Sequence, residues 1–257
     1  MSSEKLPKAQ ALRMVIFLAL WLARAAFAQV PETGRWQNFT FTHDAVREYA
    51  ASRYREVLAE LHAKGVLDDT PAVAERVSGI AETLIRSAIA LKPAAAAWQW
   101  EIHTTSDPAW DASCMAGGKL LVGTKFIEQL HLDDGELATL LGHEIAHALA
   151  EHQREELSET ALLDPTHPAI DIDTVALRLE TDLTVQIRLA RLSRIQENEA
   201  DQLGMILVNK AGWPIIDMVG FYQKLLDADP PTFRAWSHPS AAARLNMAQI
   251  LAILLSQ

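Results

Sequence analysis

Apolar residues recur at helical spacing along much of the chain. This spacing predicts helices over residues 42–64 and 71–89. Residues 98–105 are rich in aromatic and β-branched side chains, and residues 117–123 form an apolar run bounded by glycines, so both are strand candidates. The first half of the chain therefore predicts two helices followed by two short strands.

The second half of the chain is helical by the same criterion. Asp133 and Glu136 form a capping box, which is typical of a helix N-terminus. The long helical pattern further on is expected to break near Ser193. In chain order, the pattern predicts a helix to about residue 152, an irregular loop over 158–174, and helices over 175–211, 214–226 and 241–255. The expected fold class is mainly α with one small β-sheet (α+β).

The first 28 residues have the pattern of a secretory signal. A basic start is followed by an apolar run over residues 14–23, and Ala26 and Ala28 then form a small-x-small cleavage pattern. Cleavage after Ala28 would leave residues 29–257 as a single domain. The alternative is an uncleaved membrane anchor, but the run is short against the about 20 residues that span a bilayer, and Arg24 blocks its extension. The sequence predicts a periplasmic protein with no transmembrane segment after cleavage.

Composition narrows the classes of function. Of the 257 residues, 49% are hydrophobic, which is enough for one sizeable core. The formal net charge is −10 and basic residues do not cluster, so a nucleic-acid partner is not expected. Cys114 is the single cysteine, which excludes an intrachain disulfide.

The segment with the clearest chemistry is LLGHEIAHALAEH, residues 140–152. Four residues advance an α-helix by about 400°, so His143 and His147 project from nearly the same face, one turn apart. Glu144 lies about 100° further round and can accept a proton from an attacking water. The alternative is a buried helix with two ordinary histidines. However, buried histidines need partners, which a zinc ion would supply.

A catalytic zinc site needs a third protein ligand, and SRIQENEADQLG, residues 193–204, offers one. Glu197 and Asp201 share a helix face, whereas Glu199 points elsewhere. Glu197 is the expected ligand, and Asp201 is expected to accept a hydrogen bond from a ligand histidine. The alternative for this acidic pair is a solvated face, but the small and apolar residues around it favour a helix that packs inward.

Four motifs in this order, CMAGGKLLVGTKFI, LLGHEIAHALAEH, SRIQENEADQLG and SHPSAAARL, resemble the zinc peptidases that include the HtpX heat-shock proteases and the CAAX prenyl proteases. The first motif is similar to the soluble, exported branch typified by BepA and LoiP. The resemblance covers about residues 45–250 and implies a helical gluzincin fold. It implies that His143, His147 and Glu197 are the zinc ligands and that Glu144 is the general base. It also implies that His238 lies near the metal and that Arg244 helps to hold the site.

Two further interpretations concern the surroundings of this site. Gly118, Lys119, Leu120, Leu121 and Val122 are expected to form a strand at a sheet edge along the cleft, where a substrate backbone could pair with it. The alternative is an ordinary core strand. The histidines that are expected to be ordinary surface or loop residues are His103, His131, His152 and His167.

The sequence therefore predicts an exported endopeptidase with one zinc ion per chain. Its expected substrates are unfolded or misassembled proteins, and an envelope protein complex is a further expected partner. Two alternatives stay open at this stage. In one, the protein is an assembly factor or chaperone whose metal site is closed by His238. In the other, the metal is purely structural, although such sites usually have four protein ligands.

Overall fold

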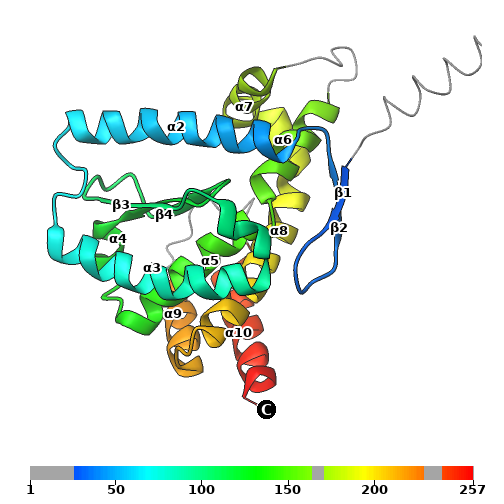
Figure 1. The fold of residues 1–257 in the computed structure, drawn as a ribbon. Coiled ribbons are helices and arrows are strands. Elements are labelled where there is room, and N and C mark those ends of the chain that lie inside the picture. The colour runs from blue at the N-terminus through cyan, green and yellow to red at the C-terminus, as the bar shows by residue number, and fades with distance from the viewer. Residues whose placement is uncertain (1–25, 164–170, 229–238, 257) are drawn as a thin grey trace, which may run out of the picture.

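The computed structural model describes residues 26–163, 171–228 and 239–256 (Figure 1). Its elements, in chain order, are β1 Ala26–Gln29, β2 Trp36–Phe39, α2 His43–Ala63, α3 Pro71–Leu91, a 3₁₀ turn η1 Pro93–Ala97, β3 Glu101–Thr105, β4 Ala112–Met115, β5 Lys119–Gly123, α4 Thr124–Gln129, α5 Asp134–Leu149, α6 His152–Leu162, α7 Ile172–Thr181, α8 Leu183–Lys210, α9 Ile215–Ala228 and α10 Ala241–Leu255. The expected mainly α fold is confirmed. No helix among these described residues is long and apolar enough to cross a membrane.

The strands form two small sheets rather than the one expected. β1 and β2 make an antiparallel hairpin, and a second sheet has the strand order β3-β5-β4. In this sheet β5 is parallel to β3 and antiparallel to β4. The strands β1, β2 and β4 were not predicted, because each is only four residues long and its sequence lacks a strong alternating pattern.

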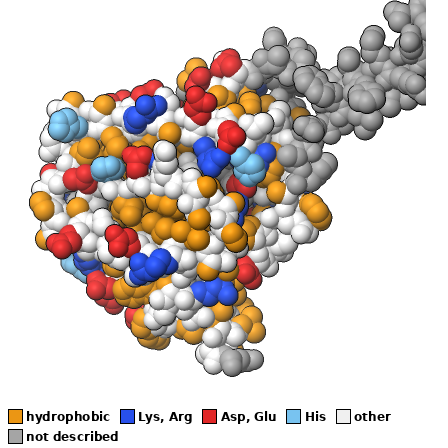
Figure 2. Space-filling view, viewed as in Figure 1, with side chains coloured by type: hydrophobic (Ala, Val, Ile, Leu, Met, Phe, Trp, Pro, Cys, Tyr) orange, Lys and Arg blue, Asp and Glu red, His pale blue; other side chains and the backbone are white. Residues whose placement is uncertain are grey.

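Helices cover the three-stranded sheet, with α2 on one side and α3 and α5 on the other (Figure 1). The Tyr54 hydroxyl of α2 donates a 2.6 Å hydrogen bond to the Leu120 carbonyl of β5, and both side chains are buried. On the face drawn in Figure 2, hydrophobic side chains gather in a band between α2 and α3, and charged side chains of both signs are interspersed around it.

α5 is the central helix of the fold. The predicted capping box is present, because Glu136 N donates to Asp133 Oδ1 at 2.9 Å and Asp133 N donates to Glu136 Oε2 at 2.9 Å. The helix ends at Leu149, three residues earlier than expected, because Glu151 adopts a left-handed conformation with φ 57°. α6 then runs to Leu162 through part of the segment that was expected to be a loop.

The predicted break in the long C-terminal helical pattern is misplaced. The break falls at Asp182, and α8 is continuous through Ser193. The Asp182 carboxylate accepts a 2.8 Å hydrogen bond from Thr184 N and so caps α8. Aspartate at this position therefore begins a new helix, whereas the Ser193 hydroxyl turns back to the Leu189 carbonyl at 3.3 Å and leaves the helix intact.

Two glycines let α5 and α8 approach closely. A Cβ atom on Gly204 of α8 would lie 2.9 Å from the backbone nitrogen of His143, and one on Gly142 of α5 would lie 2.4 Å from Val208 Cγ2. The contact brings two acidic side chains of α8, Glu197 and Asp201, beside the histidines of α5. The glycines thus set the distance on which the candidate site depends.

We expect Gly204→Ala to lower the free energy of unfolding by about 1–3 kcal/mol, the usual cost of overpacking a core. Gly79→Ala is the matched control, because a Cβ on this exposed helical glycine meets nothing within 4 Å. Alanine there should be stabilising by about 0.5–1 kcal/mol. Urea unfolding of both variants measures the two effects. A Gly204→Ala protein as stable as the Gly79→Ala protein would contradict this packing argument.

Candidate metal centre

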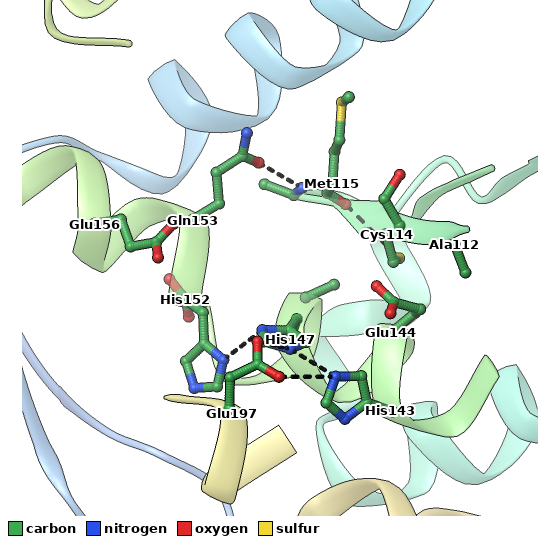
Figure 3. Close-up of a pocket in the computed structure, with 14 residues that line it drawn as sticks. Ala112, Cys114, Met115, His143, Glu144, His147, His152, Gln153, Glu156 and Glu197 are labelled. Carbon is green, nitrogen blue, oxygen red and sulfur yellow. Dashed lines mark hydrogen bonds and ion pairs between the residues drawn. The ribbon is translucent and has the colours of Figure 1, made fainter. Parts of the chain in front are cut away.

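Two of the candidate ligands come from one turn of α5. The Nε2 atoms of His143 and His147 lie 3.1 Å apart, with their rings nearly perpendicular at 76° (Figure 3). His143 is buried, and the His147 side chain is 21% exposed. The four-residue spacing thus places two imidazole nitrogens side by side at the floor of a cleft.

α8 supplies the third group. Glu197 Oε2 lies 3.5 Å from His143 Nε2, and Glu197 Oε1 lies 3.5 Å from His147 Nε2. Ligand atoms from all three residues lie within 4.8 Å of one another. Tetrahedral zinc with bonds of about 2.0–2.1 Å needs ligand atoms about 3.3–3.4 Å apart. The three residues match this arrangement, and among the described residues no further histidine, cysteine or acidic side chain joins the cluster.

The protonation of the site also fits a cation. His143 Nδ1 lies 2.9 Å from Asp201 Oδ1, so the ring proton belongs on Nδ1 and Nε2 presents a lone pair. That lone pair faces the second imidazole nitrogen and the Glu197 carboxylate. Converging lone pairs repel one another in a buried site unless a cation lies between them. The donor set of two imidazoles and one carboxylate is one that zinc accepts.

Asp201 is held by a dense set of donors. Arg244 Nε donates to its Oδ2 at 2.9 Å, Arg244 Nη2 donates to its Oδ1 at 2.6 Å, and the Tyr222 hydroxyl donates to Oδ1 at 2.9 Å. Burial would raise the pKa of Asp201, but the charge of Arg244 and the hydrogen bond with His143 lower it to about 2. Burial would likewise lower the pKa of His143, but the hydrogen bond to Asp201 raises it above its ordinary value.

His147 is backed by a residue that sequence reasoning missed. His152, expected to be an ordinary histidine, is buried, and its Nδ1 lies 2.9 Å from His147 Nδ1. Burial, reinforced by the neighbouring His143 and His152, lowers the pKa of His147 well below its ordinary value and favours the neutral ligand form. His152 begins α6 beyond a left-handed residue, so helical spacing from His147 could not predict the contact.

Glu144 lies beside the three candidate ligands at the cleft wall, below β4 (Figure 3). Burial, followed by the nearby charge of Glu197, raises its pKa to about 7, although a backbone hydrogen bond from Cys114 opposes the shift. A cation at the ligand cluster would favour the carboxylate. The position is the one expected for a group that exchanges protons with a water in the cleft.

The cleft has a volume of about 330 Å³ and is bordered by β4, α5, α6 and α8. The expectation that Gly118, Lys119, Leu120, Leu121 and Val122 form a strand at the edge of the sheet is wrong. Gly118 directly precedes β5 and the other four residues lie within it, and β5 is the central strand, with its ladder hydrogen bonds shared between β3 and β4. The strand along the cleft is β4.

Backbone N–H groups of β4 and of the residue after it point into the cleft. Cys114 N–H bonds Glu144, and Ala116 N donates to Gln153 Oε1 at 2.9 Å. These positions alternate along the chain, as expected for an edge whose outward backbone groups face a neighbour. The sheet edge along the cleft is therefore formed by β4 and not, as expected, by β5.

The remaining histidines lie away from the ligands or outside the described residues. His103 Nδ1 is 2.6 Å from Asp68 Oδ2, and His131 is exposed. His238, expected near the metal, and His167 fall outside the described residues.

An H-E-x-x-H helix packed against a helix that supplies a glutamate, with a further glutamate at the wall of an open cleft, defines a metal-dependent peptidase, a hydrolase of peptide bonds. Residues 71–251 match Peptidase family M48. Because the match covers well over half of the chain, the chain belongs to this family.

Similarity to named proteins is more distant. The chain is 29% identical to the mitochondrial metalloendopeptidase OMA1 of Arabidopsis thaliana over 56% of its own length and 30% of the relative. It is 27% identical to OMA1 of Saccharomyces cerevisiae over 60% and 47% of the two chains. It is 28% identical to the metalloprotease YcaL of Escherichia coli over 56% and 58%. The chain thus spans about a third to just over half of the length of these relatives.

Proposed function

We propose that the chain is a zinc-dependent endopeptidase with one zinc ion per chain, and that it cleaves unfolded or misassembled proteins in the cell envelope. The observation that carries the proposal is the convergence of His143, His147 and Glu197 beside the buried carboxyl of Glu144. A structural zinc site is usually closed by four protein ligands. Here the described residues supply three, at the floor of a cleft.

The cleft favours an extended polypeptide as substrate. The outward N–H groups of Cys114 and Ala116 lie along its wall, where a substrate strand could add to β4 in place of the present partners. A folded protein rarely offers a free extended segment, whereas an unfolded or misassembled one does. The named relatives are called metalloendopeptidases or metalloproteases, which agrees with cleavage within a chain.

Each residue of the centre has a distinct role in the proposed reaction. A zinc ion held by His143, His147 and Glu197 would polarise the scissile carbonyl and make water more acidic. Glu144 takes the proton from the attacking water and later gives it to the leaving amine. Asp201 holds His143 in the tautomer that binds metal, and Arg244 fixes Asp201 in place.

His238 remains a predicted member of the site. If its imidazole closes the open metal position in the resting enzyme, His238→Ala should raise proteolysis, with zinc content unchanged. If it stabilises the oxyanion, the same substitution should lower turnover. We expect the rise, because a neutral imidazole is a good zinc ligand. Equal proteolysis by both proteins at matched zinc content would leave only a role in capping the last helix.

Export of the protein is part of the proposal and rests on residues 1–28. β1 overlaps the proposed cleavage point, and cleavage after Ala28 would remove three of its four paired residues, leaving Gln29 opposite Trp36. N-terminal sequencing of the protein recovered from a periplasmic extract distinguishes cleavage from retention as an anchor. A membrane-bound protein that begins at Met1 would support the anchor, and recovery in the cytosol would exclude export.

Digestion of an unfolded protein tests the function itself. Casein incubated with the full chain should be cut into peptides, and a chelator should stop the reaction until zinc is restored. A folded globular protein offered at the same concentration should be cut much more slowly. Digestion that continues at full rate after the metal has been removed would overturn the proposal.

A further inference from the structure

The two candidate histidine ligands are held from behind by different groups. His143 meets the Asp201 carboxylate, whereas His147 meets a third imidazole, with 2.9 Å between His147 Nδ1 and His152 Nδ1. His152 Nε2 lies 3.4 Å from Glu199 Oε2. This nitrogen is buried and makes no hydrogen bond of good geometry among the described residues, so the Glu199 carboxylate is the charged group paired with it.

This arrangement determines which ring nitrogen of His147 and of His152 carries the proton. If His147 presents the lone pair of Nε2 to a metal, its proton is on Nδ1 and is donated to His152 Nδ1. His152 Nδ1 must then be an acceptor, so the His152 proton is on Nε2. That proton faces the Glu199 carboxylate across 3.4 Å between Nε2 and Oε2, an electrostatic contact rather than a well-formed hydrogen bond. The carboxylate of Glu199 therefore selects the tautomer of His152, and His152 selects that of His147.

Glu199 is in turn fixed by the loop of the N-terminal hairpin. Arg35 Nε lies 2.8 and 2.9 Å from its two oxygens, Arg35 Nη2 lies 2.8 Å from Oε2, and the Thr33 hydroxyl donates to Oε1 at 3.0 Å. These residues are 164 and 166 positions away from Glu199 in the sequence. Charge-assisted, multidentate contacts of this kind are the strong ones in proteins.

The same arginine also binds a second carboxylate, which helps to hold the hairpin against α6. Arg35 Nη1 and Nη2 bond Glu155 at 2.5 and 2.6 Å, and Gln37 Nε2 donates to Glu155 Oε2 and to the Ala150 carbonyl, at 2.9 Å each. In Figure 1 the hairpin lies beside α6 and α8, the helices that carry Glu155 and Glu199. It lies outside residues 71–251, which match the family.

We propose that the loop and second strand of the N-terminal hairpin, residues 30–39, which cleavage after Ala28 would leave in place, position the metal centre: Arg35 holds Glu199, which sets the tautomer of His152 and so keeps the Nε2 lone pair of His147 directed at the metal. Arg35, Glu199 and His152 are positioning residues for a ligand that none of the hairpin residues touches. The metal centre thus extends from α5 to the hairpin through three side chains.

Zinc affinity measures this role directly. Zinc would be titrated into the metal-free full chain in competition with a chromophoric chelator, so the result does not depend on whether the chain cleaves proteins. We expect Glu199→Gln to weaken zinc binding about 10–100-fold, the scale for loss of an outer-shell partner. Arg35→Gln should weaken zinc binding to a similar extent. The double variant should bind zinc no more weakly than Glu199→Gln alone, because both residues act through the same series of contacts.

Asp68→Asn is the matched control. It removes the carboxylate from another carboxylate–imidazole pair, Asp68 Oδ2 and His103 Nδ1 at 2.6 Å, which lies away from the clustered ligands, so zinc affinity should stay at the wild-type value. Each variant is first checked by circular dichroism. If Arg35→Gln does not fold, Arg35→Lys replaces it, since lysine keeps the charge but not the forked contact. Wild-type affinity in Glu199→Gln, or equal weakening in Asp68→Asn, would overturn the proposal.

Discussion

Glu144→Gln is expected to lower the rate of casein cleavage by about 10²-fold or more, the scale for loss of a general base. Glutamine has the shape of glutamate but cannot take a proton from water. Because Glu144 is not one of the three clustered ligands, zinc content should stay at the wild-type level. Turnover measured at matched zinc content tests the assignment, and a variant that retains wild-type turnover would exclude Glu144 as the base.

Stability provides the control for that experiment. Burial raises the folded-state pKa of Glu144 from its ordinary 4.5 to about 7 in the metal-free protein. A carboxyl with a raised folded-state pKa contributes stability below pH 4.5 that is lost as the pH rises through about 7. Glutamine carries no charge at any of these pH values. At pH 8, metal-free Glu144→Gln should therefore resist urea at least as well as the wild type, and lost activity could not be ascribed to unfolding.

Local sequence patterns predict the parts of this fold that local physics determines. Helical spacing and a capping box give α2, α3, α5 and α10 nearly in full, since each of these helices is specified by its own residues. The H-E-x-x-H spacing places His143 and His147 together for the same reason. The assignment of Glu197 required one further inference, from burial. A carboxylate on a helix that packs inward has few partners other than a metal ion or a basic side chain.

Contacts between distant segments could not be predicted in this way. β4 takes its place beside β5 only after the chain turns through Gly117 and Gly118, both at positive φ, so the identity of the edge strand depends on tertiary pairing. The link between Arg35 and Glu199 joins residues 164 positions apart, and no spacing rule reaches that far. Glu199, interpreted from its helix position as pointing elsewhere, does point away from the ligands, but toward His152.

Removing a ligand should have a larger effect on zinc binding than removing any residue behind it. We expect Glu197→Ala and His147→Ala each to abolish stoichiometric zinc binding, because only two of the three clustered ligands would remain. The loss should exceed the about 10–100-fold typical of an outer-shell partner. Metal analysis of the purified chains gives the stoichiometry, which should be one zinc per chain in the wild type. One zinc per chain in either variant would show that the ligand assignment is wrong.

Thermal unfolding gives the same prediction an independent readout. A ligand present at 100 times its Kd stabilises the folded state by about 2.7 kcal/mol. Added zinc should therefore raise the Tm of the wild type but leave that of Glu197→Ala unchanged. Glu128→Ala is the matched control, since this exposed glutamate pairs with Lys125 on α4 and lies on an element that supplies none of the clustered ligands. Its Tm should rise with zinc as in the wild type, so that a missing response in Glu197→Ala reports the lost ligand and not the lost charge.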